Sequence, residues 1–136
     1  MGAGAGMRIY KLKAFARFQR KERLGDDALV RAVKAVEDGL IGADLGGGLI
    51  KQRVARAGQG TSGGYRTVIA FWRGQRAVFL YGFAKSGRDN LDDDELDEWR
   101  TVGRAYLDLA AAGIKAAIDS KELSEVKNEQ ENEGKG

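Results

Sequence analysis

The chain has 136 residues, enough for one domain with a hydrophobic core and too few for two ordinary domains. Its 43% hydrophobic and 32% charged residues are typical of a globular protein, and no apolar run approaches the roughly 20 residues that a membrane span needs. Because cysteine and histidine are both absent, disulfides, thiolate chemistry, a histidine zinc site and a Ser-His-Asp triad are excluded. An enzyme with this composition must work with Lys, Arg, Tyr or carboxylates. With no secretory leader in view, we expect it in the cytoplasm.

The N-terminal part predicts a strand followed by a helix. Residues 1–6 (MGAGAG) precede a second methionine and are interpreted as an added leader rather than a phosphate-binding loop. Residues 8–12 favour a strand. In the helical stretch that follows, Phe15 and Phe18 share one face.

A second helix is predicted after a break at Gly25. Asp26 or Asp27 is expected to cap its first turn, and Gly39 is expected to end it. Its apolar positions recur at helical spacing: Leu29, Val33, Val36 and Leu40. We expect both helices to pack on one face of a sheet.

The middle of the chain predicts three consecutive strands. Residues 49–56 alternate in polarity, so Lys51 and Arg53 should project from the same face of the first strand. Residues 65–73 and 76–84 are separated by two residues, which is typical of an antiparallel hairpin. Three such strands in sequence indicate a meander.

The C-terminal part predicts one long amphipathic helix that begins near Asp92. Four consecutive acids at positions 92–95 suit the dipole of a first helical turn, an interpretation that we prefer to a metal site. Trp72 and Trp99 are expected to be packing residues. The apolar positions of this helix recur at steps of three and four: Leu96, Trp99, Val102, Tyr106 and Leu109.

These elements predict an α+β fold, in which a small antiparallel sheet packs against two N-terminal helices and is followed by a C-terminal helix. We expect a single domain over residues 7–118. Residues 119–136 are rich in Glu, Lys, Asn and Gly, a composition that favours a charged, disordered tail.

Charge along the chain is strongly sorted. Residues 45–88 contain no acid, whereas residues 89–98 carry seven acids and no cation, although the net charge of the whole chain is only +3. A local positive field of this kind attracts polyanions such as nucleic acid. The acid-free stretch contains eight cations: Lys51, Arg53, Arg56, Arg66, Arg73, Arg76, Lys85 and Arg88.

Three motifs in this stretch resemble a known family. They are residues 46–55 (GGGLIKQRVA), 58–67 (GQGTSGGYRT) and 80–90 (LYGFAKSGRDN). Their order and sequence are similar to the HigB-like branch of the RelE/ParE superfamily of type II toxin–antitoxin toxins. The resemblance covers most of the chain from Arg8 to about residue 112.

The resemblance implies a RelE-like toxin that cleaves mRNA, commonly at the ribosome, without a metal or another cofactor. In that reaction the 2′-hydroxyl of the RNA attacks the adjacent phosphate and leaves a 2′,3′-cyclic phosphate and a 5′-hydroxyl. The implied partners are mRNA, the ribosome and a cognate antitoxin, expected to be a DNA-binding protein encoded next to the toxin. No membrane partner is expected.

The resemblance also implies site residues. The expected catalytic set is Lys51, Arg53, Arg66, Lys85 and Tyr81, and the expected RNA-binding set is Arg56, Tyr65 and Arg88. Arginine does not lose its proton in proteins, so the general base should be a lysine. Lys51 is preferred because nearby cations disfavour its charged form, and Lys85 stays open as the alternative.

The chain departs from the family pattern at two positions. Leu91 stands where some relatives have a catalytic tyrosine, so Tyr81 or Tyr65 would have to substitute, and Thr61 stands where related sequences often have lysine. Two other functions stay open. One is a toxin of the same fold that binds a protein target such as DNA gyrase, and the other is a non-catalytic RNA-binding protein.

Overall fold

The structure, a computed structural model, describes residues 7–56, 60–84 and 92–126. Its centre is one mixed sheet of six strands in the order β2-β3-β4-β5-β1-β6. Neighbouring strands are antiparallel, except that β1 runs parallel to β5. The strands are β1 Arg8–Leu12, β2 Ala43–Gly46, β3 Leu49–Arg56, β4 Gly60–Trp72, β5 Arg76–Ala84 and β6 Leu123–Val126.

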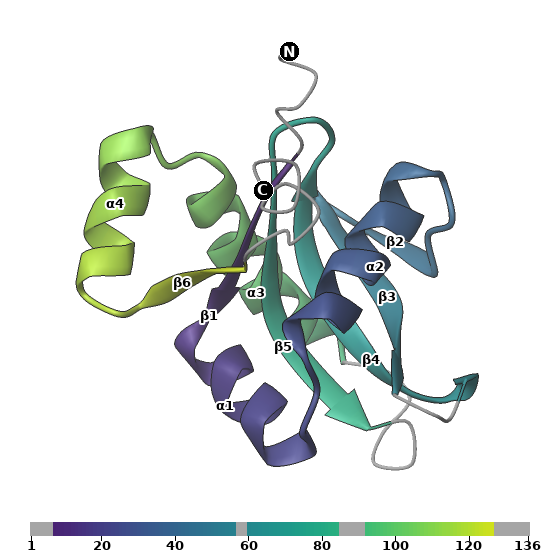
Figure 1. Cartoon of the computed structure of the whole chain (residues 1–136). Helices are drawn as coiled ribbons and strands as arrows, with labels where there is room; N and C mark the ends of the chain where they lie inside the picture. The colour runs from purple at the N-terminus through teal and green to yellow at the C-terminus, as the bar shows by residue number, and fades with distance from the viewer. Residues whose placement is uncertain (1–6, 57–59, 85–91, 127–136) are drawn as a thin grey trace.

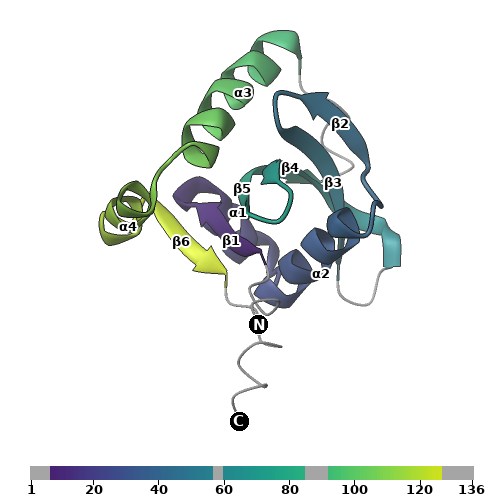
Figure 2. The same ribbon diagram turned by 90° about the horizontal axis from the view of Figure 1, so that it is seen from above.

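Helices cover both faces of the sheet (Figures 1 and 2). α1 (Lys13–Glu22) and α2 (Asp26–Glu37) share one buried cluster with residues such as Ile50, Ile69 and Phe79. α3 (Asp93–Leu107) and α4 (Ala111–Asp119) close a second cluster on the opposite face. No helix in the described part of the chain is long and apolar enough to span a membrane.

The structure confirms the α+β fold and the meander of β3, β4 and β5. The sheet is antiparallel, as predicted, except at β1, because the chain leaves β1 through α1 and α2 and reaches the far edge at β2. This crossover leaves β1 parallel to β5. A single C-terminal helix is wrong, because the chain turns after Leu107 and continues as α4.

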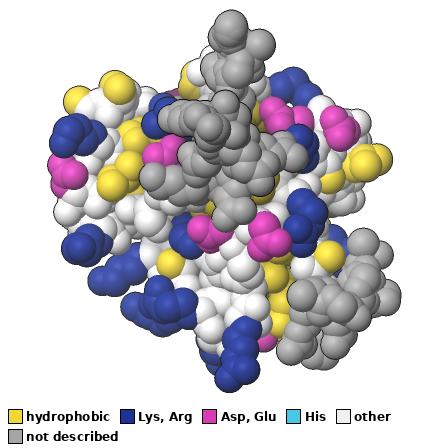
Figure 3. Space-filling model, in the orientation of Figure 1, with side chains coloured by type: hydrophobic (Ala, Val, Ile, Leu, Met, Phe, Trp, Pro, Cys, Tyr) yellow, Lys and Arg dark blue, Asp and Glu magenta, His cyan; other side chains and the backbone are white. Residues whose placement is uncertain are grey.

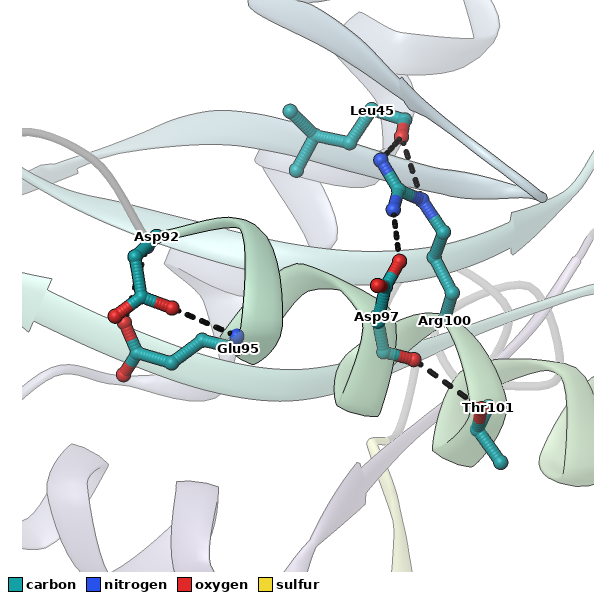
Figure 4. A network of polar contacts seen from close by, with 6 residues as sticks. All are labelled: Leu45, Asp92, Glu95, Asp97, Arg100 and Thr101. Carbon is teal, nitrogen blue, oxygen red and sulfur yellow. Dashed lines mark hydrogen bonds and ion pairs between the residues drawn. The ribbon is translucent and has the colours of Figure 1, made fainter.

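The start of α3 was predicted correctly, and the start of α2 was not. The Asp92 carboxylate accepts a hydrogen bond from the Glu95 amide, and the Glu95 carboxylate accepts one from the Asp92 amide, which is a capping box (Figure 4). The N-cap of α2 is Gly25, which has no side chain to donate or accept. The Asp26 carboxylate instead accepts hydrogen bonds from the side chains of Lys11 and Gln19.

Two apolar residues are more exposed than the sequence predicted. Leu40 lies beyond the end of α2, where Gly39 adopts a φ of +91°, and 68% of its surface is exposed. Trp72, at the end of β4, is 50% exposed and is not a buried packing residue. Trp99 does pack, with its ring centroid 5.6 Å from that of Tyr81.

The expected disordered tail is wrong for residues 119–126. Leu123 and Val126 are buried, and β6 pairs antiparallel with β1 along the edge of the sheet. Leu123 belongs to the second cluster and Val126 to the cluster of α1 and α2, so β6 packs on both faces of the sheet. Residues 127–136 and the proposed leader at 1–6 lie outside the described residues.

Candidate active site

The register of the meander brings three cations together. Lys51 and Arg53 alternate along β3 with Ile50 and Val54, as predicted. Ile50 and Val54 are buried under α1 and α2, so Lys51 and Arg53 project from the opposite face, the one that α3 covers. Arg53 lies directly opposite Arg66 on β4. Directly opposed residues in an antiparallel pair have Cβ atoms about 5 Å apart, so these two arginines are immediate neighbours.

Lys51, Arg53 and Arg66 line one pocket together with Gly42, which precedes β2. The pocket has a volume of about 170 Å³. A Cβ atom at Gly42 would lie 2.6 Å from the backbone oxygen of Lys51, so only glycine lets the chain approach β3 this closely. Since one water occupies about 30 Å³ of liquid, the pocket has room for a phosphate group.

The two arginines of this pocket have no acidic partner in the part of the chain that the structure describes. Within the described ranges, neither Arg53 nor Arg66 forms an ion pair or a side-chain hydrogen bond, and no acid lines the pocket. Larger hollows beside α3 are lined by Arg100 and Arg104, but both of these cations have acidic partners, Asp97 within α3 and Asp108 at its C-cap. The smaller pocket is therefore the better anion site.

A β-bulge adds aromatic residues to the same face. Val68 pairs with Tyr81 and Ile69 pairs with Phe79, so Leu80 is an extra residue in β5. The bulge reverses the alternation, and Tyr81 and Phe83 consequently face the side of Arg66. The Tyr81 ring lies between Phe83 and Trp99, with centroid distances of 5.8 and 5.6 Å.

Tyr65 does not belong to this site. It is 2% exposed on the opposite face of the sheet, where its ring meets Phe18 edge-on and its hydroxyl donates a hydrogen bond to Glu22. The expectations that Tyr65 contacts RNA or substitutes for a catalytic tyrosine are therefore wrong. Lys85 and Arg88 lie outside the described residues, and Arg56 is the last residue of β3.

Two further cations of the acid-free stretch are structural. Arg76 donates to the carbonyl oxygens of Tyr106, Leu107 and Leu109, at 2.8, 3.4 and 2.9 Å, just where α3 ends. Arg73 donates to the carbonyl oxygen of Glu37 at the end of α2. A helix C-terminus carries partial negative charge, so both arginines satisfy helix ends and are not available to a ligand.

The residue that the sequence did not indicate is Arg100, which fixes α3 beside the site (Figure 4). Its guanidinium donates twice to the carbonyl oxygen of Leu45, at 3.0 and 2.7 Å, and once to the carboxylate of Asp97. α3 is therefore tied to β2, next to the pocket. No group of three or more acidic residues within the described ranges is arranged to hold a metal ion.

Comparison with known proteins identifies one family. The model of the RelE toxin of the RelE/RelB toxin–antitoxin system matches residues 7–126, from β1 through β6. A search of the curated proteins finds no match. The matched range includes all three residues of the cationic pocket and both strands that the sequence did not predict.

Proposed function

The chain belongs to the RelE toxin family of the RelE/RelB toxin–antitoxin system, and from this premise we propose that it is an endoribonuclease that cleaves mRNA at the ribosome and so inhibits translation. Family membership implies a cognate antitoxin as its partner. Within the family we place it in the HigB-like branch, on the three motifs at residues 46–55, 58–67 and 80–90.

The observation that carries the proposal is the convergence of Lys51, Arg53 and Arg66 on one pocket with no acid among its described lining residues. In this reaction the 2′-hydroxyl of the RNA attacks the adjacent phosphate. A bond forms between O2′ and phosphorus, and the bond between phosphorus and O5′ breaks. The phosphorane formed between these events carries more negative charge on its equatorial oxygens than the diester. Cations positioned in advance stabilise that charge selectively, which lowers the barrier.

We assign the roles by what each group can do. Arg53 and Arg66 hold the phosphate with charge-assisted hydrogen bonds, because guanidinium groups match the geometry of phosphate oxygens. Lys51 takes the proton of the 2′-hydroxyl, with Lys85 as the alternative base. Tyr81 is assigned to donate a hydrogen bond toward the leaving O5′, which accepts a proton as the bond breaks.

The test is inducible expression followed by mapping of RNA ends in translating extracts. We expect growth arrest and cuts inside translated messages, with 5′-hydroxyl ends. Lys51→Ala combined with Arg66→Ala should abolish both, because loss of one charge-stabilising donor alone costs about 100-fold or more in rate. Arg31→Ala combined with Arg104→Ala removes the same charge from exposed, paired positions and should leave cleavage intact.

Three outcomes would contradict the proposal. Growth arrest with intact messages and altered DNA topology would indicate a protein target such as gyrase. RNA binding without cleavage would indicate a non-catalytic RNA-binding protein. Cleavage that stops when EDTA is added, with ribosomes held intact by polyamines, would contradict the metal-free mechanism.

The antitoxin should meet the same cations with acidic side chains. Opposed charges at an interface contribute to the association rate and to specificity, so Arg53→Glu combined with Arg66→Glu should weaken the complex. An unchanged affinity would place the antitoxin on another surface.

A further inference from the structure

α1 presents a second concentration of positive charge. Four of its cations, Lys13, Arg17, Arg20 and Lys21, follow one another at helical steps of four, three and one, and therefore form a single stripe. Arg23 follows directly at the C-cap of the helix. All five side chains are exposed, and none forms an ion pair with a residue in the described ranges.

The charge of this segment exceeds that of the whole chain. Residues 13–23 contain five cations and one acid, Glu22, for a net charge of +4. The other residues hold 18 cations and 19 acids, for a net charge of −1, which together give the total of +3. Like charges at these helical spacings cost roughly 0.2–0.5 kcal/mol per pair, which offsets the favourable interaction of Arg20 and Lys21 with the C-terminal end of the helix dipole.

The stripe cannot belong to the cationic pocket, because the two lie on opposite faces of the sheet. α1 buries Phe15 and Gln19 in the cluster that it shares with α2, whereas the pocket opens on the face of α3. Figure 3 shows a group of Lys and Arg side chains at the lower left, over the position of α1 in Figure 1. An RNA strand in the pocket would have to cross the sheet to reach them.

We propose that the α1 stripe binds the phosphate backbone of a base-paired, structured RNA, separate from the strand that is cut. This inference deepens the proposed function, since it supplies a second contact that would hold the toxin on an RNA-containing particle. The four cations span about 12 Å of helix axis from Lys13 to Lys21, a row that suits a line of phosphates. Base-paired RNA is bound mainly through its backbone and shape, which suits a surface without exposed aromatic residues.

The packing of α1 argues against a membrane as the partner. A basic helix that lies on a membrane inserts its apolar face among the lipids. Here that face is fully occupied, because Phe15 is 1% exposed and its ring packs on Phe18 and Phe79. Only the charged side of α1 is available to a partner.

The experiment compares two triple variants of the full chain. Arg17→Gln/Arg20→Gln/Lys21→Gln neutralises the stripe, and glutamine keeps a helix propensity close to that of arginine and lysine. The control Arg31→Gln/Arg104→Gln/Lys115→Gln removes the same charge from exposed residues, each paired with an acid four positions away. The probe is an RNA duplex of about 16 base pairs, the length that dsRNA-binding domains span, with affinity measured over a range of salt concentrations.

We expect the stripe variant to bind the duplex about tenfold more weakly than the wild type, or weaker still. The slope of log K against the logarithm of the salt concentration should decrease in magnitude by about three, because three phosphate contacts are lost. The affinity and slope of the control should stay near those of the wild type. Cleavage of mRNA in translating extracts should fall in the stripe variant and stay near the wild type in the control. Lys51→Ala/Arg66→Ala should still bind the duplex. If the wild type binds the duplex through the stripe but cuts no RNA, the result contradicts the proposed endoribonuclease activity and still supports RNA binding by α1.

Two results would overturn the inference. Equal duplex affinity and salt slope in the stripe variant and the wild type would show that α1 does not bind RNA. Loss of duplex binding in Lys51→Ala/Arg66→Ala would show one shared RNA site instead of two. If the stripe variant kept the duplex and lost affinity only for the antitoxin, the occupant would be an acidic protein.

Discussion

Replacement of Arg53 by glutamine should stabilise the fold while it removes activity. Arg53 lies opposite Arg66 and two residues from Lys51 on the same face of β3, so it has two neighbours of like charge. Like charges directly opposed across strands destabilise a sheet. The cations of the pocket should therefore destabilise the fold when no anion lies between them.

The size of this destabilisation follows from the spacing. Side chains two residues apart on a strand, or opposed across two strands, place their charges about 7 Å apart. Two unit charges at that distance in water repel by roughly 0.6 kcal/mol, so removal of two such pairs gains about 1 kcal/mol at low salt. At 0.1 M salt the Debye length of about 10 Å halves this gain, and at 1 M it nearly vanishes.

The measurement is urea denaturation of wild type and Arg53→Gln at low and high salt. A gain of about 1 kcal/mol corresponds to a rise of roughly 4 °C in Tm for a chain of this size. Arg104→Gln is the matched control, because Arg104 pairs with Asp108 and its loss should be neutral or slightly destabilising. If Arg53→Gln lowers stability, or if its gain does not shrink with salt, the three cations do not repel one another as described.

Three further predictions concern the fold. Arg76→Met leaves three carbonyl oxygens at the end of α3 without their donor and should lower the free energy of unfolding, measured by urea denaturation, by about 2 kcal/mol. A decrease below about 0.5 kcal/mol would show that these hydrogen bonds do not stabilise the end of α3. Burial, together with its hydrogen bond to Glu122, raises the pKa of Tyr106 to about 12, so the folded state keeps a proton that the unfolded state releases near pH 10. Stability should thus be lost as pH rises from 10 to 12, and Tyr106→Phe should flatten that decline in alkaline unfolding curves. Gly64→Ala places a Cβ 2.2 Å from the Val54 carbonyl oxygen and should cost about 2 kcal/mol or more, and a neutral effect on Tm would mean that β3 and β4 separate easily.

The parts of the fold that were predictable have strong local patterns. β3 alternates with a period of two, β5 contains a continuous apolar run, and α3 begins with a capping-box sequence, so their approximate bounds follow from the residues. β2 and β6 have only four residues each, ADLG and LSEV, and little β-branched content. Such strands exist because a neighbouring strand supplies hydrogen-bond partners, which a local pattern does not reveal.

The candidate site was partly predictable for the same reason. Alternation along β3 places Lys51 and Arg53 on one face, but their proximity to Arg66 depends on the register between β3 and β4. Tyr81 faces the site only because of the bulge at Leu80, which the sequence does not mark. Arg76 looked like another cation of the same charged stretch, and only tertiary structure shows that it caps α3.

The position of β1 has a consequence for the synthesis of the protein. β1 is the first of the six described strands in chain order, yet both of its partners come later, β5 near the middle of the chain and β6 at the end of the described part. Until both exist, β1 has unpaired backbone groups, and long-range pairing of this kind slows folding. A chain stopped before Leu123 would carry an open strand edge beside β1, which favours aggregation. Synthesis interrupted before Leu123 would therefore yield an aggregation-prone fragment, so the sheet of this toxin is complete only once β6 has been made.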